Sequence, residues 1–146
     1  MVNEVSRGSE DEDEEAEAAA TPTNRAYWEE KASKGTVAIA DELLSILRES
    51  DPSLSLTYKK NYIGLMKDKS TDNFVVFKPK KSHLNMELRI PRSDELDARL
   101  EAGGLEMLEY SKQWNRYRIH ISKVDLAERR PIVAELLKGA YERSKN

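Results

Sequence analysis

Apolar residues along this chain recur at two spacings, one typical of amphipathic helices and the other of strands. Between Thr36 and Glu49 they fall three and four positions apart, which predicts a helix that ends at Ser50-Asp51-Pro52. From His83 to Ile90 every second residue is apolar, which predicts a strand. Its inward residues are expected to be Leu84, Met86, Leu88 and Ile90, and its outward residues His83, Asn85, Glu87 and Arg89.

Residues 114–121, Trp-Asn-Arg-Tyr-Arg-Ile-His-Ile, form the most informative alternating segment. At the two-residue period of a strand, one face carries Tyr117, Ile119 and Ile121, and the other carries Trp114, Arg116, Arg118 and His120. The first set can enter a core, whereas the second forms a cationic, partly aromatic row. The segment therefore predicts a strand with a core face and a candidate binding face.

The remaining elements are predicted from composition, turn residues and helix caps. Short strands are expected at 54–58, 62–66 and 74–77, with a turn at 70–73. Helices are expected after Asn24, from Ser93 or Asp94 to Gly103-Gly104, and from Ser122, where Asp125 completes a capping box and Pro131 kinks or splits the helix.

The resulting order, α-β-β-β-β-α-β-α, predicts an α+β fold. Because the links are short and the strands alternate cleanly, we expect an antiparallel or mixed sheet of about 4–5 strands with helices packed mainly on one face.

Charge divides the chain into two parts. Residues 1–24 contain eight acidic residues and one basic residue, whereas residues 25–146 contain 19 acidic and 23 basic residues. Self-repulsion and a lack of large apolar groups predict a disordered acidic tail at 1–24, followed by a single α+β domain at 25–146. The chain has no cysteine, no apolar run long enough to cross a bilayer and no signal-peptide pattern, so we expect a cytoplasmic protein without a membrane partner.

Basic residues are expected to gather on the open face of the sheet, beside flat rings. Surfaces that bind nucleic acid combine cations for phosphates with rings that stack on bases. The candidate nucleic-acid-binding residues are Lys78, Lys80, Lys81, Arg89, Trp114, Arg116, Arg118 and His120, with Lys59, Lys60 and His83 nearby. The alternative is a solvated face on which the arginines pair across strands with Glu87 or Glu109.

Motifs for catalysis are weak in this sequence. There is no Gly-x-Ser-x-Gly and no glycine-rich phosphate loop, and the two histidines, His83 and His120, lack metal-site spacing. Tyr62-Ile63-Gly64 matches half of the GIY-YIG nuclease signature, and Asp72 with Glu87-Leu88-Arg89 loosely resembles the acidic pair and cation of restriction-type nucleases. We therefore predict no catalytic residue, no metal and no cofactor, and keep a small metal-dependent nuclease as a third hypothesis.

Four segments resemble a known family: Asn61–Gly64, Asn73–Lys81, Glu87–Ile90 and Trp114–Ile119. The chain is similar from about Tyr27 to Tyr141 to an uncharacterised bacterial domain labelled "predicted transport protein". Similar segments occur as a C-terminal module behind GIY-YIG nuclease domains and in restriction-associated proteins. The resemblance implies an accessory, nucleic-acid-directed module, and it supplies no catalytic residues.

Together these observations favour a non-enzymatic module that binds nucleic acid, or a nucleic-acid-processing partner, through a basic-aromatic sheet face. A protein-binding module that uses the acidic tail or a sheet edge is the alternative hypothesis.

Overall fold

The structure is a computed structural model that describes residues 23–145. Residues 1–22 of the predicted acidic tail therefore lie outside the described part of the chain. The helices are α2 (Arg25–Lys31), α3 (Lys34–Arg48), α4 (Asp94–Gly103), α5 (Lys123–Glu128) and α6 (Arg130–Ser144). The strands are β1 (Leu54–Tyr58), β2 (Ile63–Lys67), β3 (Ser70–Thr71), β4 (Val75–Pro79), β5 (Leu84–Leu88), β6 (Glu106–Met107) and β7 (Tyr117–Ile121).

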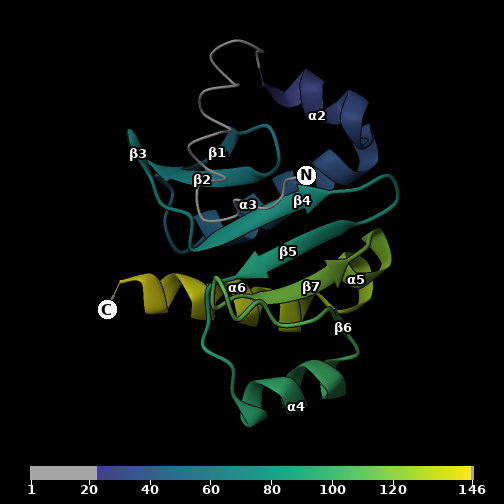
Figure 1. Cartoon of the computed structure of the whole chain (residues 1–146), viewed down its shortest axis with the longest axis vertical. Helices are drawn as coiled ribbons and strands as arrows, with labels where there is room; N and C mark the ends of the chain where they lie inside the picture. The colour runs from purple at the N-terminus through teal and green to yellow at the C-terminus, as the bar shows by residue number, and fades with distance from the viewer. Residues whose placement is uncertain (1–22, 146) are drawn as a thin grey trace.

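The strands form one antiparallel sheet in the order β1-β2-β4-β5-β7-β6, with the short β3 paired to β2 (Figure 1). Strand β5 is central, because it pairs along its whole length with β4 on one side and with β7 on the other. Its neighbour β7 begins 29 residues after β5 ends (88 to 117). The α+β class and the antiparallel sheet are as predicted.

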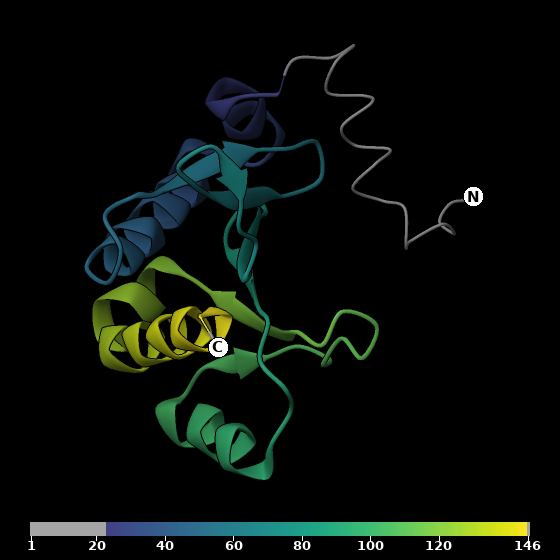
Figure 2. The ribbon, with the colours of Figure 1, turned by 90° about the vertical axis from the view of Figure 1, so that its left-hand side faces the viewer.

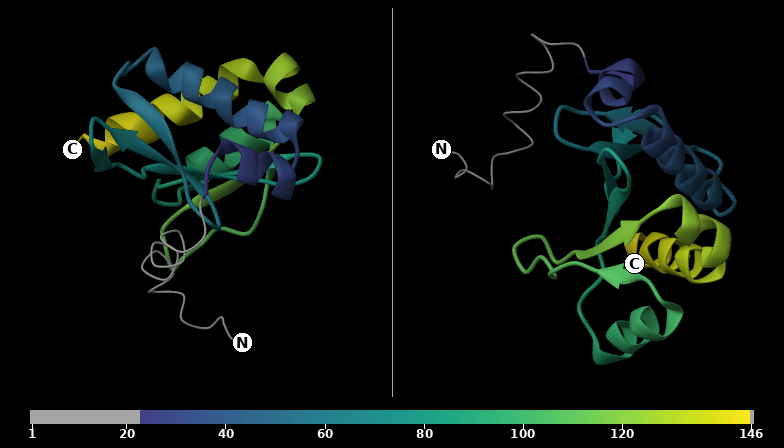
Figure 3. Two further views of the ribbon diagram at one scale, coloured as in Figure 1. Left: turned by 90° about the horizontal axis from the view of Figure 1, so that it is seen from above. Right: turned by 90° about the vertical axis from the view of Figure 1, so that its right-hand side faces the viewer.

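Helices α3, α5 and α6 cover one face of the sheet, whereas the segment between β6 and β7 projects from the other (Figure 2; Figure 3, right). The alternating strand residues that face the helices are fully buried, as the pattern in β5 and β7 predicted. This core joins sheet and helix residues, among them Leu43, Phe77, Leu84, Met86, Leu88, Tyr117, Ile119, Ile121, Val133 and Leu137. Burial of these side chains is the main force that holds the helices to the sheet.

Helix ends follow the local signals in the sequence. The Asn24, Ser93 and Ser122 side chains accept hydrogen bonds from the first turns of α2, α4 and α5. Asp125 completes the capping box at Ser122. Gly104 ends α4 with a left-handed φ of 78°, a conformation that a glycine adopts without strain. Pro131 lies in the first turn of α6, so the predicted final helix is split into α5 and α6.

The sheet has more strands than the 4–5 that the sequence predicted. Ser70–Thr71, expected as part of a turn, pairs with β2, and Glu106–Met107 pairs with the end of β7. Both additions are only two residues long. Each depends on a neighbouring strand for its hydrogen bonds, so no alternation in its own sequence reveals it.

The last strand begins at Tyr117 rather than at the predicted Trp114. Asn115 has a left-handed φ of 54°, which ends the extended conformation. The backbones of Ser111 and Arg116 exchange two hydrogen bonds of 2.9 and 3.1 Å, and Leu108 N–H donates to the Arg118 carbonyl at 2.7 Å. Residues 108–116 thus form a short hairpin, called here the 108–116 hairpin, and Trp114 lies in its turn.

A buried carboxylate, Asp51, links the segment after α3 to β2 and to α6. Asp51, which follows α3, forms an ion pair with Lys67 of β2 and accepts a hydrogen bond of 3.2 Å from the Tyr141 hydroxyl of α6. Ser53 Oγ donates a further hydrogen bond at 2.6 Å. The Lys67 ammonium and the Ser53 donors hold the pKa of the Asp51 carboxyl well below its ordinary value of 3.8.

Because the pKa of Asp51 is lowered on folding, its contribution to stability is present above pH 3.8 and is lost as the pH falls toward the folded-state pKa. We predict that Asp51→Asn lowers the free energy of unfolding at pH 7 and that its difference from the wild type narrows below pH 3.8. Urea denaturation across this pH range measures both effects. Glu49→Gln, which removes an exposed carboxylate two residues away, is the control. A constant difference at every pH would contradict the prediction.

Candidate functional site

The face of the sheet opposite the helices carries two rows of side chains from β4, β5 and β7. In one row Glu87 of β5 lies between Val76 of β4 and Arg118 of β7. In the next row Asn85 lies between Lys78 and His120. This open face therefore brings together polar residues that are 42 positions apart in the sequence (78 to 120). Three of the predicted site residues lie on this face: Lys78 on one side of β5, and Arg118 and His120 on the other.

Glu87 is buried at the centre of this face, with only 3% of its surface exposed. Its carboxylate forms ion pairs with Lys78 Nζ at 3.2 Å, Arg118 Nε at 3.4 Å and Arg116 Nη1 at 3.5 Å. These four residues are called here the Glu87 cluster. A buried charge is costly unless it is paired, and here three cations surround one anion.

The Glu87 cluster has features of both interpretations that the sequence left open for the basic face. Arg116 and Arg118 do pair across strands with Glu87, as the solvated-face interpretation proposed. However, one carboxylate cannot neutralise three cations, so an excess of positive charge stays on the face. Asn85 and Glu87 lie on the outer face of the sheet, as the alternation predicted, but both are buried there. The surrounding side chains from β4 and β7 cover them.

A cavity of about 510 Å³ lies between the open face and the 108–116 hairpin. From the sheet it is lined by Lys78, Glu87 and Arg118, and from the hairpin by residues 109–114. Trp114 is partly exposed, and its ring centroid lies 5.8 Å from the guanidinium carbon of Arg116, within the range of a cation–π contact. The tryptophan is therefore at the site, although it reaches the site from a turn and not from the strand that the sequence predicted.

Two buried side-chain atoms in the described part of the chain have no hydrogen-bond partner, and both belong to the open face. They are Asn85 Oδ1 and Arg116 Nε. Buried polar atoms are nearly always bonded to protein or to ordered water, so an unbonded one requires a reason. Here the packing of the open face encloses an acceptor and a donor without a partner beside the same charged cluster.

The two histidines meet at the end of this face. The rings of His83 and His120 stack with centroids 4.1 Å apart and planes at 19°. Burial, followed by the charges of His120 and Lys80, lowers the pKa of His83, so this ring is neutral at pH 7. His120 Nδ1 lies 4.0 Å from Asp125 Oδ2. Within residues 23–145 no group of three metal-ligating side chains comes together.

Three predicted site residues lie away from the cavity. Lys80 and Lys81 are exposed in the turn between β4 and β5, and Arg89 is exposed just beyond the end of β5. Lys81 lines a separate pocket near the starts of α3 and α5, with Ser33 and Ser122. The structure therefore does not bring all the basic residues of the sequence onto one patch.

The sequence interpretation missed the residues of the hairpin that complete the cavity. They are Tyr110, Ser111, Lys112 and Gln113, whereas Glu109 was expected only as a pairing partner of the arginines. A polar run that includes Asn115 directly before an alternating strand is a turn signal, and it could have separated Trp114 from the strand. The overhang of the turn above β4 and β5 is a tertiary feature that no local signal predicts.

Residues 25–144 match the family described as a domain of unknown function, DUF5655. The chain belongs to this family. No curated protein and no solved structure matches the chain. None of the described helices of this DUF5655 domain is long and apolar enough to span a bilayer.

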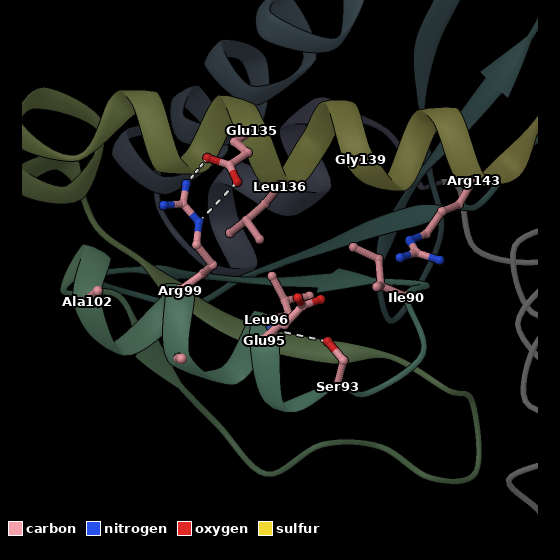
Figure 4. Close-up of a pocket in the computed structure, with 11 residues that line it drawn as sticks. Ile90, Ser93, Glu95, Leu96, Arg99, Ala102, Glu135, Leu136, Gly139 and Arg143 are labelled. Atoms are coloured by element: carbon pink, nitrogen blue, oxygen red, sulfur yellow. Dashed lines mark hydrogen bonds and ion pairs between the residues drawn. The ribbon is translucent and has the colours of Figure 1, made fainter.

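The DUF5655 domain has a second concavity, a groove of about 690 Å³ between α4 and α6 (Figure 4). Its surface is formed by Ile90, Leu96 and Leu136, together with the side-chain-free Gly139. An exposed ion pair between Arg99 of α4 and Glu135 of α6 crosses it. Exposed pairs of this kind contribute less than about 1 kcal/mol. The groove is mainly apolar, whereas the cavity on the open face gathers charge and a ring, which makes the open face the better candidate site.

We predict that Glu87→Gln lowers the free energy of unfolding by about 1–3 kcal/mol, because the amide leaves three cations without a counter-charge. Added salt should recover part of this loss by screening their repulsion. Urea denaturation at pH 7, at low and high salt, measures both effects. Glu109→Gln is the matched control, since Glu109 lines the same cavity but is exposed, and it should change stability by less than about 0.5 kcal/mol. Equal stability of the two variants would show that the cluster does not depend on its anion.

Proposed function

We propose that this domain is a non-enzymatic module that binds nucleic acid through the open face, in the cavity beneath the 108–116 hairpin. The observation that carries the proposal is the convergence of Lys78, Arg116 and Arg118 on one buried carboxylate, next to the ring of Trp114. Protein partners that process nucleic acid are a related class of ligand for the same module.

The chemistry of the face fits a ligand that has both phosphates and flat bases. The excess cations can neutralise phosphates, and an antiparallel sheet with an exposed ring is a common platform for stacking bases. The similarity to modules found behind GIY-YIG nuclease domains and in restriction-associated proteins also favours a nucleic-acid ligand. A cytoplasmic location is consistent with this proposal.

The decisive experiment removes two cations that line the cavity while most of the Glu87 cluster is kept. Lys112→Ala/Arg118→Ala should weaken binding to a fluorescein-labelled single-stranded oligonucleotide by about tenfold at low salt. If each residue contacts one phosphate, the slope of log K against log salt should fall by about 1.4. Fluorescence anisotropy over a salt series measures both quantities.

The control for this experiment is Arg130→Ala/Lys138→Ala, which removes two exposed cations from α6. It removes the same charge as Lys112→Ala/Arg118→Ala, but from the side of the molecule on which the helices lie. If both double variants weaken binding equally, the attraction is non-specific. If the wild type does not bind any oligonucleotide at low salt, the proposed function is wrong.

The protein-binding alternative rests on the acidic tail or a sheet edge. Residues 1–24 carry eight acidic residues against one basic residue, enough charge to compete with phosphates for a basic face.

Under the main proposal, deletion of residues 1–24 should raise the affinity for an oligonucleotide at low salt and leave it unchanged at high salt. Parallel titrations of the full chain and the truncated chain measure this. Unchanged affinity at low salt would show that the tail does not act on this face.

The nuclease hypothesis requires Glu87 to hold a metal ion. Both carboxylate oxygens of Glu87 already contact cations from Lys78, Arg116 and Arg118, which a metal would have to displace. This arrangement disfavours Glu87 as a metal ligand. Cleavage of DNA or RNA in the presence of Mg²⁺ or Mn²⁺ that Glu87→Gln abolishes would favour the nuclease instead.

A further inference from the structure

The geometry of the cavity points to single-stranded nucleic acid as the ligand. We propose that one unpaired base enters the space between the sheet and the 108–116 hairpin and stacks on Trp114. This inference rests on the proposed function and narrows it to one class of nucleic acid.

The 108–116 hairpin shapes the open face. The 108–116 hairpin stands out from the side of the sheet that lacks helices (Figure 2), so the open face is not a flat platform along its whole length. The cavity beneath the hairpin, of about 510 Å³, is in the size range of sites for small molecules. A base that is paired and stacked in a duplex can enter such a site only after it leaves its stack, whereas a base in a single strand is already free. The shape therefore favours a single strand.

The two tryptophans differ in their burial and in their hydrogen bonds. Trp28 belongs to the core, is 2% exposed and donates from Nε1 to the Lys59 carbonyl at 2.7 Å. Trp114 is partly exposed, lies outside the core cluster and lines the cavity. Its Nε1–H has no partner among the described residues. The ring of Trp114 is therefore placed for a ligand, whereas the ring of Trp28 holds the fold together.

The turn of the hairpin holds the backbone of Trp114 in place. The backbone of Trp114 donates to Ser111 Oγ at 3.3 Å, and the two hydrogen bonds between Ser111 and Arg116 close the turn. The left-handed Asn115 completes it. A ring held by a closed turn loses little freedom when a base stacks on it, so the site is organised before the ligand arrives.

Cations lie on two sides of the cavity. Lys78 and Arg118 are on the sheet side, and Lys112, exposed and without an ion pair among the described residues, is on the hairpin side. Cations on both sides of a ring can contact the phosphates before and after a stacked base.

The test compares three probes of one mixed sequence: a single-stranded oligodeoxynucleotide, the same strand with abasic sites in place of its bases, and the matching duplex. Fluorescence anisotropy at constant low salt should show that the wild type binds the ordinary single strand about tenfold more tightly than the abasic strand. The duplex should also bind more weakly, although its charge density is higher.

Variants at Trp114 test the ring itself. Trp114→Ala should bind the ordinary strand as weakly as the abasic strand, because no ring is left for a base to stack on. Trp114→Phe should keep most of the preference for bases. Thermal unfolding should be the same for both variants as for the wild type, since Trp114 lies outside the core.

Each outcome separates this inference from the proposed function. Equal affinity for the ordinary and abasic strands, or tighter binding of the duplex, would overturn base insertion. The proposed function would still stand in that case if Lys112→Ala/Arg118→Ala weakens binding and its control does not. If none of the three probes binds the wild type, both proposals fail.

Discussion

The charge of Glu87, buried on the outer side of the central strand β5, is the constraint that organises the open face. A carboxylate in that position is stable only if cations approach it, and they come from β4 and from the start of β7. The register of three strands is therefore coupled to one ionic cluster. A shift of β7 by one residue would place Tyr117 on the open face and would separate Arg116 and Arg118 from their anion.

The two faces of the sheet perform different physical tasks. The inner face is apolar and closely packed against α3 and α6, so it supplies most of the stability. The outer face has polar and charged side chains, two buried polar atoms without partners, and a cavity beneath the 108–116 hairpin. The Glu87 cluster couples the strands of this face, whereas the exposed cations and the ring of Trp114 contribute little to stability.

Membership of the DUF5655 family assigns a relationship and no activity, so the functional argument depends on the site alone. Within the described residues the concave surfaces differ in kind. The groove between α4 and α6 offers apolar contact area, whereas the cavity on the open face offers positive charge and a ring. A ligand with phosphates and bases matches the second kind of surface, and this match is the basis of both proposals.

Much of the fold was predictable, because its signals are local. Alternation along β5 and β7, the caps at Asn24, Ser93 and Ser122, and the break at Pro131 each depend on residues within one or two turns of the chain. The two-residue strands β3 and β6 were missed because their hydrogen bonds depend on neighbouring strands. Trp114 was misplaced because the alternating pattern of residues continues through Asn115, whose left-handed backbone ends the strand.

Alternation within residues 114–121 is enough to predict that one side of the last strand enters the core and that Arg116, Arg118 and His120 share the opposite side. The position of Lys78 and Glu87 beside the two arginines, of Lys81 near the starts of α3 and α5, and of the hairpin over the cluster depends on how strands and helices pack. These residues lie far apart in the sequence. Alternation decides which face a residue occupies, whereas the pairing of strands far apart in the sequence decides which residues become neighbours on that face.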